Sequence, residues 1–82
     1  MNQSRMQELK NYCYEKLQAI ESILETTTSF TFAPILKLRL VTKQNILKHI
    51  VDYETYFNFA NIEDLEKYLE DRTNTVCGFY EE

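Results

Sequence analysis

Apolar residues recur at intervals of three and four along the first part of the chain. They are Met6, Leu9, Cys13, Leu17, Ile20 and Leu24. Residues at this spacing lie on one face of an α-helix. Three threonines and a serine at 26–29 end the pattern, because threonine loses side-chain freedom in a helix and its hydroxyl competes for backbone partners. The sequence therefore predicts a long amphipathic helix over residues 4–25.

The segment 35–53 is compatible with two structures. If it is one helix, the apolar half of that helix also carries Arg39 and Lys43, while Leu38 and Val41 point to water. Such a helix would bury charges and expose aliphatic side chains, which is the reverse of the usual pattern. This conflict favours dividing the segment.

Division at Thr42 gives two regular patterns. Residues 36–40 alternate between leucine and a basic side chain, as a half-buried strand does. Thr42 can then cap a helix that continues to Tyr53. The apolar face of that helix consists of Ile46, Leu47, Ile50 and Val51. We therefore expect a strand followed by a helix.

The last third of the sequence predicts a strand, a helix and a second strand. Residues 55–59 are aromatic and extended, with both phenylalanines on one side and Tyr56 on the other. Asn61 is a helix cap, and the spacing that follows predicts a helix over 62–72. Thr–Asn at 73–74 ends that helix, and residues 75–80 are expected to form a short strand.

These expectations give an α+β fold. Helices that alternate with strands usually pack on one sheet. We predict a single domain over residues 1–82, with a small three-stranded sheet, packed helices and a long N-terminal helix. The alternative is an all-α three-helix bundle in which residues 34–53 form one long helix.

The charges of the chain are unevenly distributed. The net charge of −4 divides into +3 for residues 1–51 (seven basic, four acidic) and −7 for 52–82 (two basic, nine acidic). The basic region 37–49 is a candidate anion-binding surface formed by Lys37, Arg39, Lys43 and Lys48. It points to a nucleic-acid-binding accessory factor as one alternative function. Acidic side chains of the predicted helix 62–72 point to another alternative function, in which the chain imitates nucleic acid and occupies a protein that binds it.

Catalytic, cofactor and metal sites are not expected. One glycine cannot build a phosphate-binding loop, and one histidine excludes a multi-histidine metal site within one chain. The two cysteines, Cys13 and Cys77, lack metal-ligand spacing and are expected to be buried, reduced thiols, although spacing alone leaves a disulfide open. We therefore predict that the protein is not an enzyme.

Aromatic residues are abundant for so small a core, with six tyrosines and five phenylalanines. Large rings at a surface bind partners with little loss of entropy. The predicted partner-binding residues are Tyr53, Tyr56, Glu63, Glu66 and Glu70. The long first helix offers more apolar surface than a small sheet needs, which predicts a homodimer.

The favoured function is a small, non-catalytic protein-interaction module that binds another protein and regulates or inhibits it. We expect it in the cytoplasm and away from membranes, because no apolar run is long enough to span a bilayer. Nucleic-acid binding is the less favoured alternative, since the isoelectric point is near 5.0. Asn, Ile and Lys are frequent and Ala is rare, which suggests a phage or another mobile element.

Overall fold

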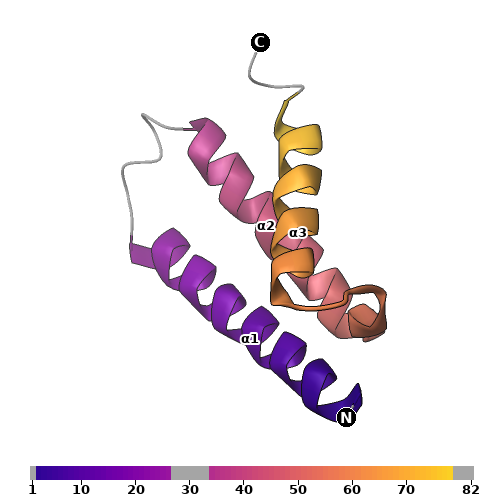
Figure 1. Cartoon of the computed structure of the whole chain (residues 1–82). Helices are drawn as coiled ribbons and strands as arrows, with labels where there is room; N and C mark the ends of the chain where they lie inside the picture. Colours follow the sequence, from indigo (N-terminus) through magenta and orange to yellow (C-terminus); the bar gives the residue numbers. More distant parts are fainter. Residues whose placement is uncertain (1, 27–33, 79–82) are drawn as a thin grey trace.

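The part of the chain that the structure describes folds into three helices and one short 3-10 turn. The computed structural model describes residues 2–26 and 34–78, and Figure 1 shows their path. The elements are α1 (Asn2–Thr26), α2 (Pro34–Tyr53), η2 (Thr55–Asn58) and α3 (Ile62–Cys77). No strand occurs in these two ranges. The predicted α+β fold with a three-stranded sheet is therefore wrong, and the alternative, a three-helix bundle, is the architecture.

Helix α2 is the centre of the bundle. It packs extensively against both α1 and α3, whereas α1 and α3 touch each other sparsely. Figure 1 shows the consequence: α1 and α3 diverge toward their C-terminal ends, and α2 runs between them. Within the described part of the chain, no helix is both long and apolar enough to cross a membrane.

The core lies where the three helices meet. Each helix contributes one leucine that is completely buried, namely Leu9, Leu47 and Leu65. Cys13 and Ile20 of α1 are also buried, as the apolar spacing predicted for this helix. Further members of the core cluster are Ile50, Tyr56, Phe59 and Leu69.

The segment 35–53 is one helix, so the predicted strand at 36–40 is wrong. Because α2 has a neighbour on two sides, its apolar residues spread over a wide arc, and Leu38 and Val41 are half-buried. Arg39 and Lys43 lie at the contact with α3, where both pair with Glu70. The two basic residues that argued against a single helix are thus paired with a carboxylate of the neighbouring helix.

Two threonines predicted to interrupt helices lie inside them instead. Thr42 is buried within α2, and its hydroxyl donates to the Leu38 carbonyl (2.7 Å). Thr73 is completely buried within α3, and its hydroxyl donates to the Leu69 carbonyl (2.6 Å). Each hydroxyl is satisfied by the carbonyl four residues earlier, so its burial leaves no unpaired donor.

Helix α3 therefore continues to Cys77, whose buried thiol lies 3.9 Å from the Thr42 hydroxyl. The prediction of a strand at 75–80 is wrong for residues 75–78, because 75–77 belong to α3 and Gly78 is its C-cap. Its last two residues, 79 and 80, lie outside the described residues. The end of α3 thus packs on the middle of α2.

The aromatic segment after α2 is a 3-10 turn and not the predicted strand. Glu54 has a left-handed backbone (φ 52°, ψ 42°), which reverses the chain direction after α2. The environments of two aromatic residues in this turn are the reverse of those predicted: Tyr56 is buried, and Phe57 is 66% exposed. Phe59 is extended and buried.

The predicted cap of the last helix is confirmed. The Asp64 backbone N–H donates to Asn61 Oδ1 (2.8 Å), and the Ala60 N–H donates to Asp64 Oδ2 (3.0 Å). Glu63 and Asp64 also lie in the first turn, where carboxylates complement the helix dipole. These contacts fix the direction in which α3 leaves the turn.

Candidate functional site

An open groove lies between α2, η2 and α3, and we call it the aromatic groove. Its volume is about 670 Å³, within the range of sites that accept ligand or peptide side chains. Its floor is apolar, because Ile50 and Phe59 are buried there. Tyr68 forms one wall, with its ring centroid 5.2 Å from that of Phe59. The lining residues are Asn45, Ile46, His49, Ile50, Thr55, Asn58, Phe59, Tyr68 and Arg72.

Exposed aromatic rings lie at this groove. Tyr68 is 41% exposed within it, and Tyr53 is about two-thirds exposed beside it. Phe57, also about two-thirds exposed, precedes the lining residue Asn58 in the chain. Tyr53 lies against the groove residue His49, with ring centroids 4.5 Å apart. Large exposed rings near a recess are typical of protein contact surfaces, because they bury much area with few rotatable bonds.

The charge of the aromatic groove is opposite to that of the chain. Its lining contains Arg72 and His49 but no carboxylate, although the protein has 13 acidic residues and a net charge of −4. Arg72 is exposed and makes no ion pair with any residue of the ranges 2–26 and 34–78. A guanidinium beside apolar side chains is suited to a carboxylate that arrives with an apolar residue.

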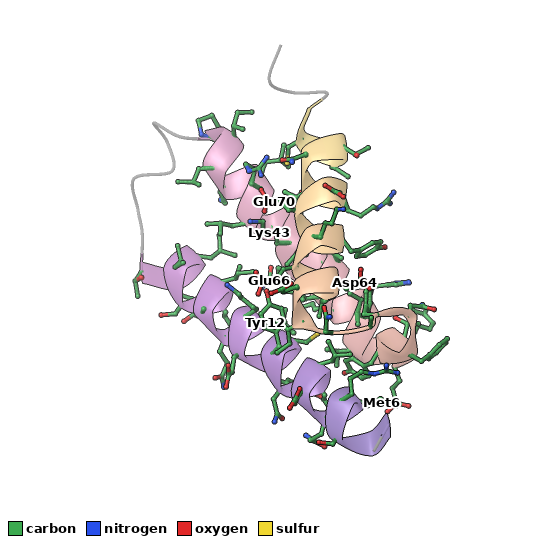
Figure 2. All side chains as sticks on the ribbon, in the orientation of Figure 1. Met6, Tyr12, Lys43, Asp64, Glu66 and Glu70 are labelled. Carbon is green, nitrogen blue, oxygen red and sulfur yellow. The ribbon has the colours of Figure 1, made fainter. Side chains whose placement is uncertain are left out.

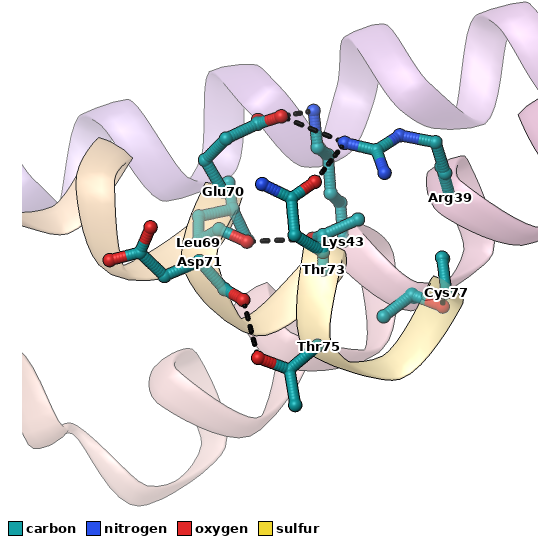
Figure 3. A network of polar contacts seen from close by, with 10 residues as sticks. Arg39, Lys43, Leu69, Glu70, Asp71, Thr73, Thr75 and Cys77 are labelled. Carbon is teal, nitrogen blue, oxygen red and sulfur yellow. Dashed lines mark hydrogen bonds and ion pairs between the residues drawn. The ribbon is translucent and has the colours of Figure 1, made fainter. Parts of the chain in front are cut away.

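A network of polar contacts joins α2 to α3 on the other side of the bundle (Figure 3). Arg39 Nη2 donates to Glu70 Oε1 (2.8 Å) and to Asn74 Oδ1 (2.9 Å), and Lys43 Nζ lies 3.1 Å from Glu70 Oε2. The hydrogen bond from Lys43, together with the charge of Arg39, lowers the pKa of the Glu70 carboxyl. We call the ion pairs of Arg39 and Lys43 with Glu70 the interhelical clamp.

The structure separates the four predicted anion-binding residues. Arg39 and Lys43 lie at the α2–α3 contact and are paired with Glu70. Lys37 and Lys48 are exposed and eleven positions apart, about three helical turns, so they share a different, solvent-facing side of α2. The four cations therefore do not form one continuous patch.

The predicted partner-binding tyrosines have different environments. Tyr53 is exposed, as expected, and lies beside the aromatic groove. Tyr56, which we expected at the surface, is only 3% exposed, and burial raises its pKa to about 12. Its hydroxyl has no hydrogen-bond partner among the described residues. Tyr56 is thus a core residue.

The three predicted glutamates, Glu63, Glu66 and Glu70, are exposed, and none of them lines the aromatic groove. Glu66 lies near Tyr12 of α1, as Figure 2 shows, and contributes with burial to a pKa of about 12 for that tyrosine. Glu70 is occupied by the clamp. The acidic surface is therefore distinct from the groove.

Sequence reasoning missed three groove residues. Tyr68 and Arg72 were not selected from the sequence as site residues, and His49 was considered only as the single histidine of the chain. The spacing of Tyr68 and Arg72, four residues apart, places both on one side of α3 and was the available signal. Their juxtaposition with α2 depends on the turn at Glu54, which the sequence did not predict.

The two cysteines are free and buried, as predicted. Burial raises the pKa of the Cys13 thiol to about 11. Within the described residues, no group of three His, Cys, Asp or Glu side chains is placed to hold a metal ion. Comparison with known protein families, curated proteins and solved structures finds no match to this chain.

Proposed function

We propose that this chain is a small, non-catalytic protein-interaction domain that binds a segment of another protein in the aromatic groove. The observation that carries the proposal is the composition of that groove, which combines an exposed tyrosine, Arg72 and a complete lack of carboxylates in an acidic protein. The bound segment would act by occupying the groove, so the domain would regulate or inhibit its partner through binding alone.

The groove favours a segment that carries a carboxylate next to a large apolar side chain. The apolar side chain would rest on Ile50 and Phe59 and beside the Tyr68 ring, where burial of apolar surface contributes about 25 cal/mol per Å². The carboxylate would pair with Arg72 at the edge of the groove. Asn45 and Asn58 offer amide groups to the backbone of the segment.

Binding to nucleic acid remains the alternative, with less support. This alternative depends on the four predicted anion-binding residues. Two of them, Arg39 and Lys43, are paired with Glu70. Of the four, only Lys37 and Lys48 have no charged partner among the described residues. Mimicry of nucleic acid by the acidic side chains of α3 also has less support, because Asp64 accepts a hydrogen bond from the Ala60 N–H and Glu70 is paired with Arg39 and Lys43. We propose the cytoplasm as the compartment, and the two free thiols support it.

The proposal is tested by selecting short random peptides from a display library on the immobilised protein. We expect enrichment of peptides that combine Asp or Glu with an aromatic or large aliphatic residue. Their affinity, measured by fluorescence anisotropy, should fall about tenfold or more for Tyr68→Ala and for Arg72→Ala. Lys67→Ala is the matched control, because Lys67 is exposed on α3 but does not line the groove.

Two results would contradict the proposal. One is the absence of any enriched peptide, and the other is equal affinity of the selected peptides for the wild type and both groove variants. Tyr68 and Arg72 are exposed, so their replacement should leave the fold intact, which circular dichroism checks.

A further inference from the structure

A second groove opens where α1 and α3 diverge, on the other side of α3 from the aromatic groove. We call it the α1–α3 groove, and its volume is about 250 Å³. Figure 2 shows Tyr12 and Glu66 beside each other in this opening, with Lys43 and Glu70 farther along it. Its lining residues are Tyr12, Lys16, Ala19, Ile20, Ile23, Leu40, Lys43, Glu66, Leu69 and Glu70.

Aliphatic side chains are exposed at the wide end of this groove. Ile23 of α1 is 43% exposed. Leu36 of α2 is 54% exposed and precedes the groove residue Leu40 by one helical turn, so it extends the same side of α2. A three-helix bundle with apolar residues exposed between two diverging helices can bury these residues by packing against the helices of another molecule.

The two walls of the α1–α3 groove carry opposite charges. Lys43 and Glu70 are already paired with each other, and the remaining charged lining residues are Lys16 on the α1 wall and Glu66 on the α3 wall. Both are exposed, and neither makes an ion pair with another described residue. They lie at the same level of the groove, because Lys16 Nζ is 5.7 Å from the centroid of the Tyr12 ring and Figure 2 shows Glu66 beside the same tyrosine.

We propose that the α1–α3 groove is the interface of a homodimer, in which α1 of each copy faces α3 of the other. A two-fold contact presents the same surface on both sides, so this surface must complement itself. Rotation about an axis parallel to the groove places Lys16 of each copy opposite Glu66 of the other. Rotation about an axis across the groove would place Lys16 opposite Lys16. The wall charges therefore select the parallel axis.

This dimer is independent of the proposed peptide binding, because the two grooves share no lining residue. The apolar contact would bury Ile23 and Leu36 of both copies, and the Lys16–Glu66 pairs would form twice. The dimer would leave both aromatic grooves open, and a partner with two segments would then bind with increased avidity.

The first test is the mass of the full chain by sedimentation equilibrium over a range of concentrations. We expect a reversible dimer with twice the 9.8 kDa mass of the chain. Ile23→Glu and Leu36→Glu should each raise the dissociation constant tenfold or more, because each places an unpaired carboxylate in the apolar contact. Phe57→Glu is the control, because it places the same charge on an exposed apolar residue outside this groove and should leave the dimer intact.

The second test examines the pairing of the walls. Lys16→Glu and Glu66→Lys should each weaken the homodimer, because every wall contact then joins like charges. An equimolar mixture of the two variants should form a heterodimer, in which both contacts join opposite charges. For the orientation, chains with Lys16→Cys should form disulfides with chains carrying Glu66→Cys and not with one another.

Three results would overturn the proposal. The wild-type chain could stay monomeric, which would leave the groove to a foreign partner. The dimer could be unchanged by Ile23→Glu and Leu36→Glu. Disulfides between two Lys16→Cys chains would show the other axis. A circular dichroism spectrum matched to the wild type shows that a variant is folded, and the exposure of all five substituted side chains favours this.

Discussion

Arg39 of α2 and Glu70 of α3 face each other across the helix contact, with Nη2 and Oε1 2.8 Å apart. Lys43, one turn farther along α2, reaches the other oxygen of the same carboxylate at 3.1 Å. One glutamate thus receives two cations from the apolar side of α2. This relationship explains why α2 is a continuous helix although its apolar half includes two basic residues.

The clamp predicts a pH-dependent contribution of Glu70 to stability. Its pKa is lowered in the folded chain, first by the hydrogen bond from Lys43, so the contribution is complete above the ordinary carboxyl range and is lost as the pH falls through the folded pKa. Glu70→Gln should lower the free energy of unfolding by about 1 kcal/mol or less at pH 7, because the side chain is half exposed.

Urea unfolding of both proteins at several pH values measures this effect. The difference between wild type and Glu70→Gln should shrink as the pH falls below about 4. Asp71→Asn is the control, since Asp71 is exposed on the same helix, lies outside its first turn and makes no ion pair to a described residue. A difference that grows in acid would contradict the assignment.

The buried hydroxyl of Tyr56 predicts a stabilising substitution. This hydroxyl is removed from water without a hydrogen-bond partner among the described residues, which is energetically unfavourable. Tyr56→Phe keeps the ring and removes the hydroxyl, so the free energy of unfolding should rise by about 1 kcal/mol. Thermal and urea unfolding measure the change. A destabilised Tyr56→Phe variant would show that the hydroxyl is satisfied in solution.

The Asn61 cap predicts a measurable loss when its side chain is removed. Asn61→Ala leaves the Asp64 N–H without its acceptor and should cost about 1 kcal/mol. Asn61→Ser retains an acceptor at the same position and serves as the matched control. Equal stability of the two variants in urea would contradict the role of the cap.

The environment of Cys13 predicts slow thiol chemistry in the folded protein. Burial raises its pKa to about 11, so only a small fraction is thiolate at pH 8, and the sulfur is also shielded from reagents. A thiol reagent such as DTNB should modify the native chain slowly and the urea-unfolded chain rapidly. Cys13→Ser gives the signal of Cys77 alone as the control. Rapid labelling of the native chain at Cys13 would contradict the burial.

The two outer helices were predictable because their signals are local. Helix α1 follows from the spacing of its buried residues Leu9, Cys13 and Ile20, and α3 begins where Asn61 predicts a cap. The existence of both helices depends on residues within a few positions of one another. Tertiary contacts were not needed to recognise them.

The errors concern residues whose environment is set by distant parts of the chain. Arg39 appears misplaced until Glu70, 31 positions later, is known to neutralise it. Thr42 resembles a cap because the sequence does not show that its hydroxyl bonds to the preceding turn. The same holds for the aromatic groove, since Tyr68 and His49 come together only after the chain reverses at Glu54.

The central position of α2 also determines how the molecule can come apart. Because α1 and α3 contact each other sparsely, loss of α2 would leave neither with a sufficient neighbour. Fraying of α1, in contrast, leaves α2 and α3 joined by their own apolar contact and by the three-residue clamp. Detachment of α1 alone would therefore leave a helical hairpin of residues 34–78, with the surface that α1 covers exposed to water.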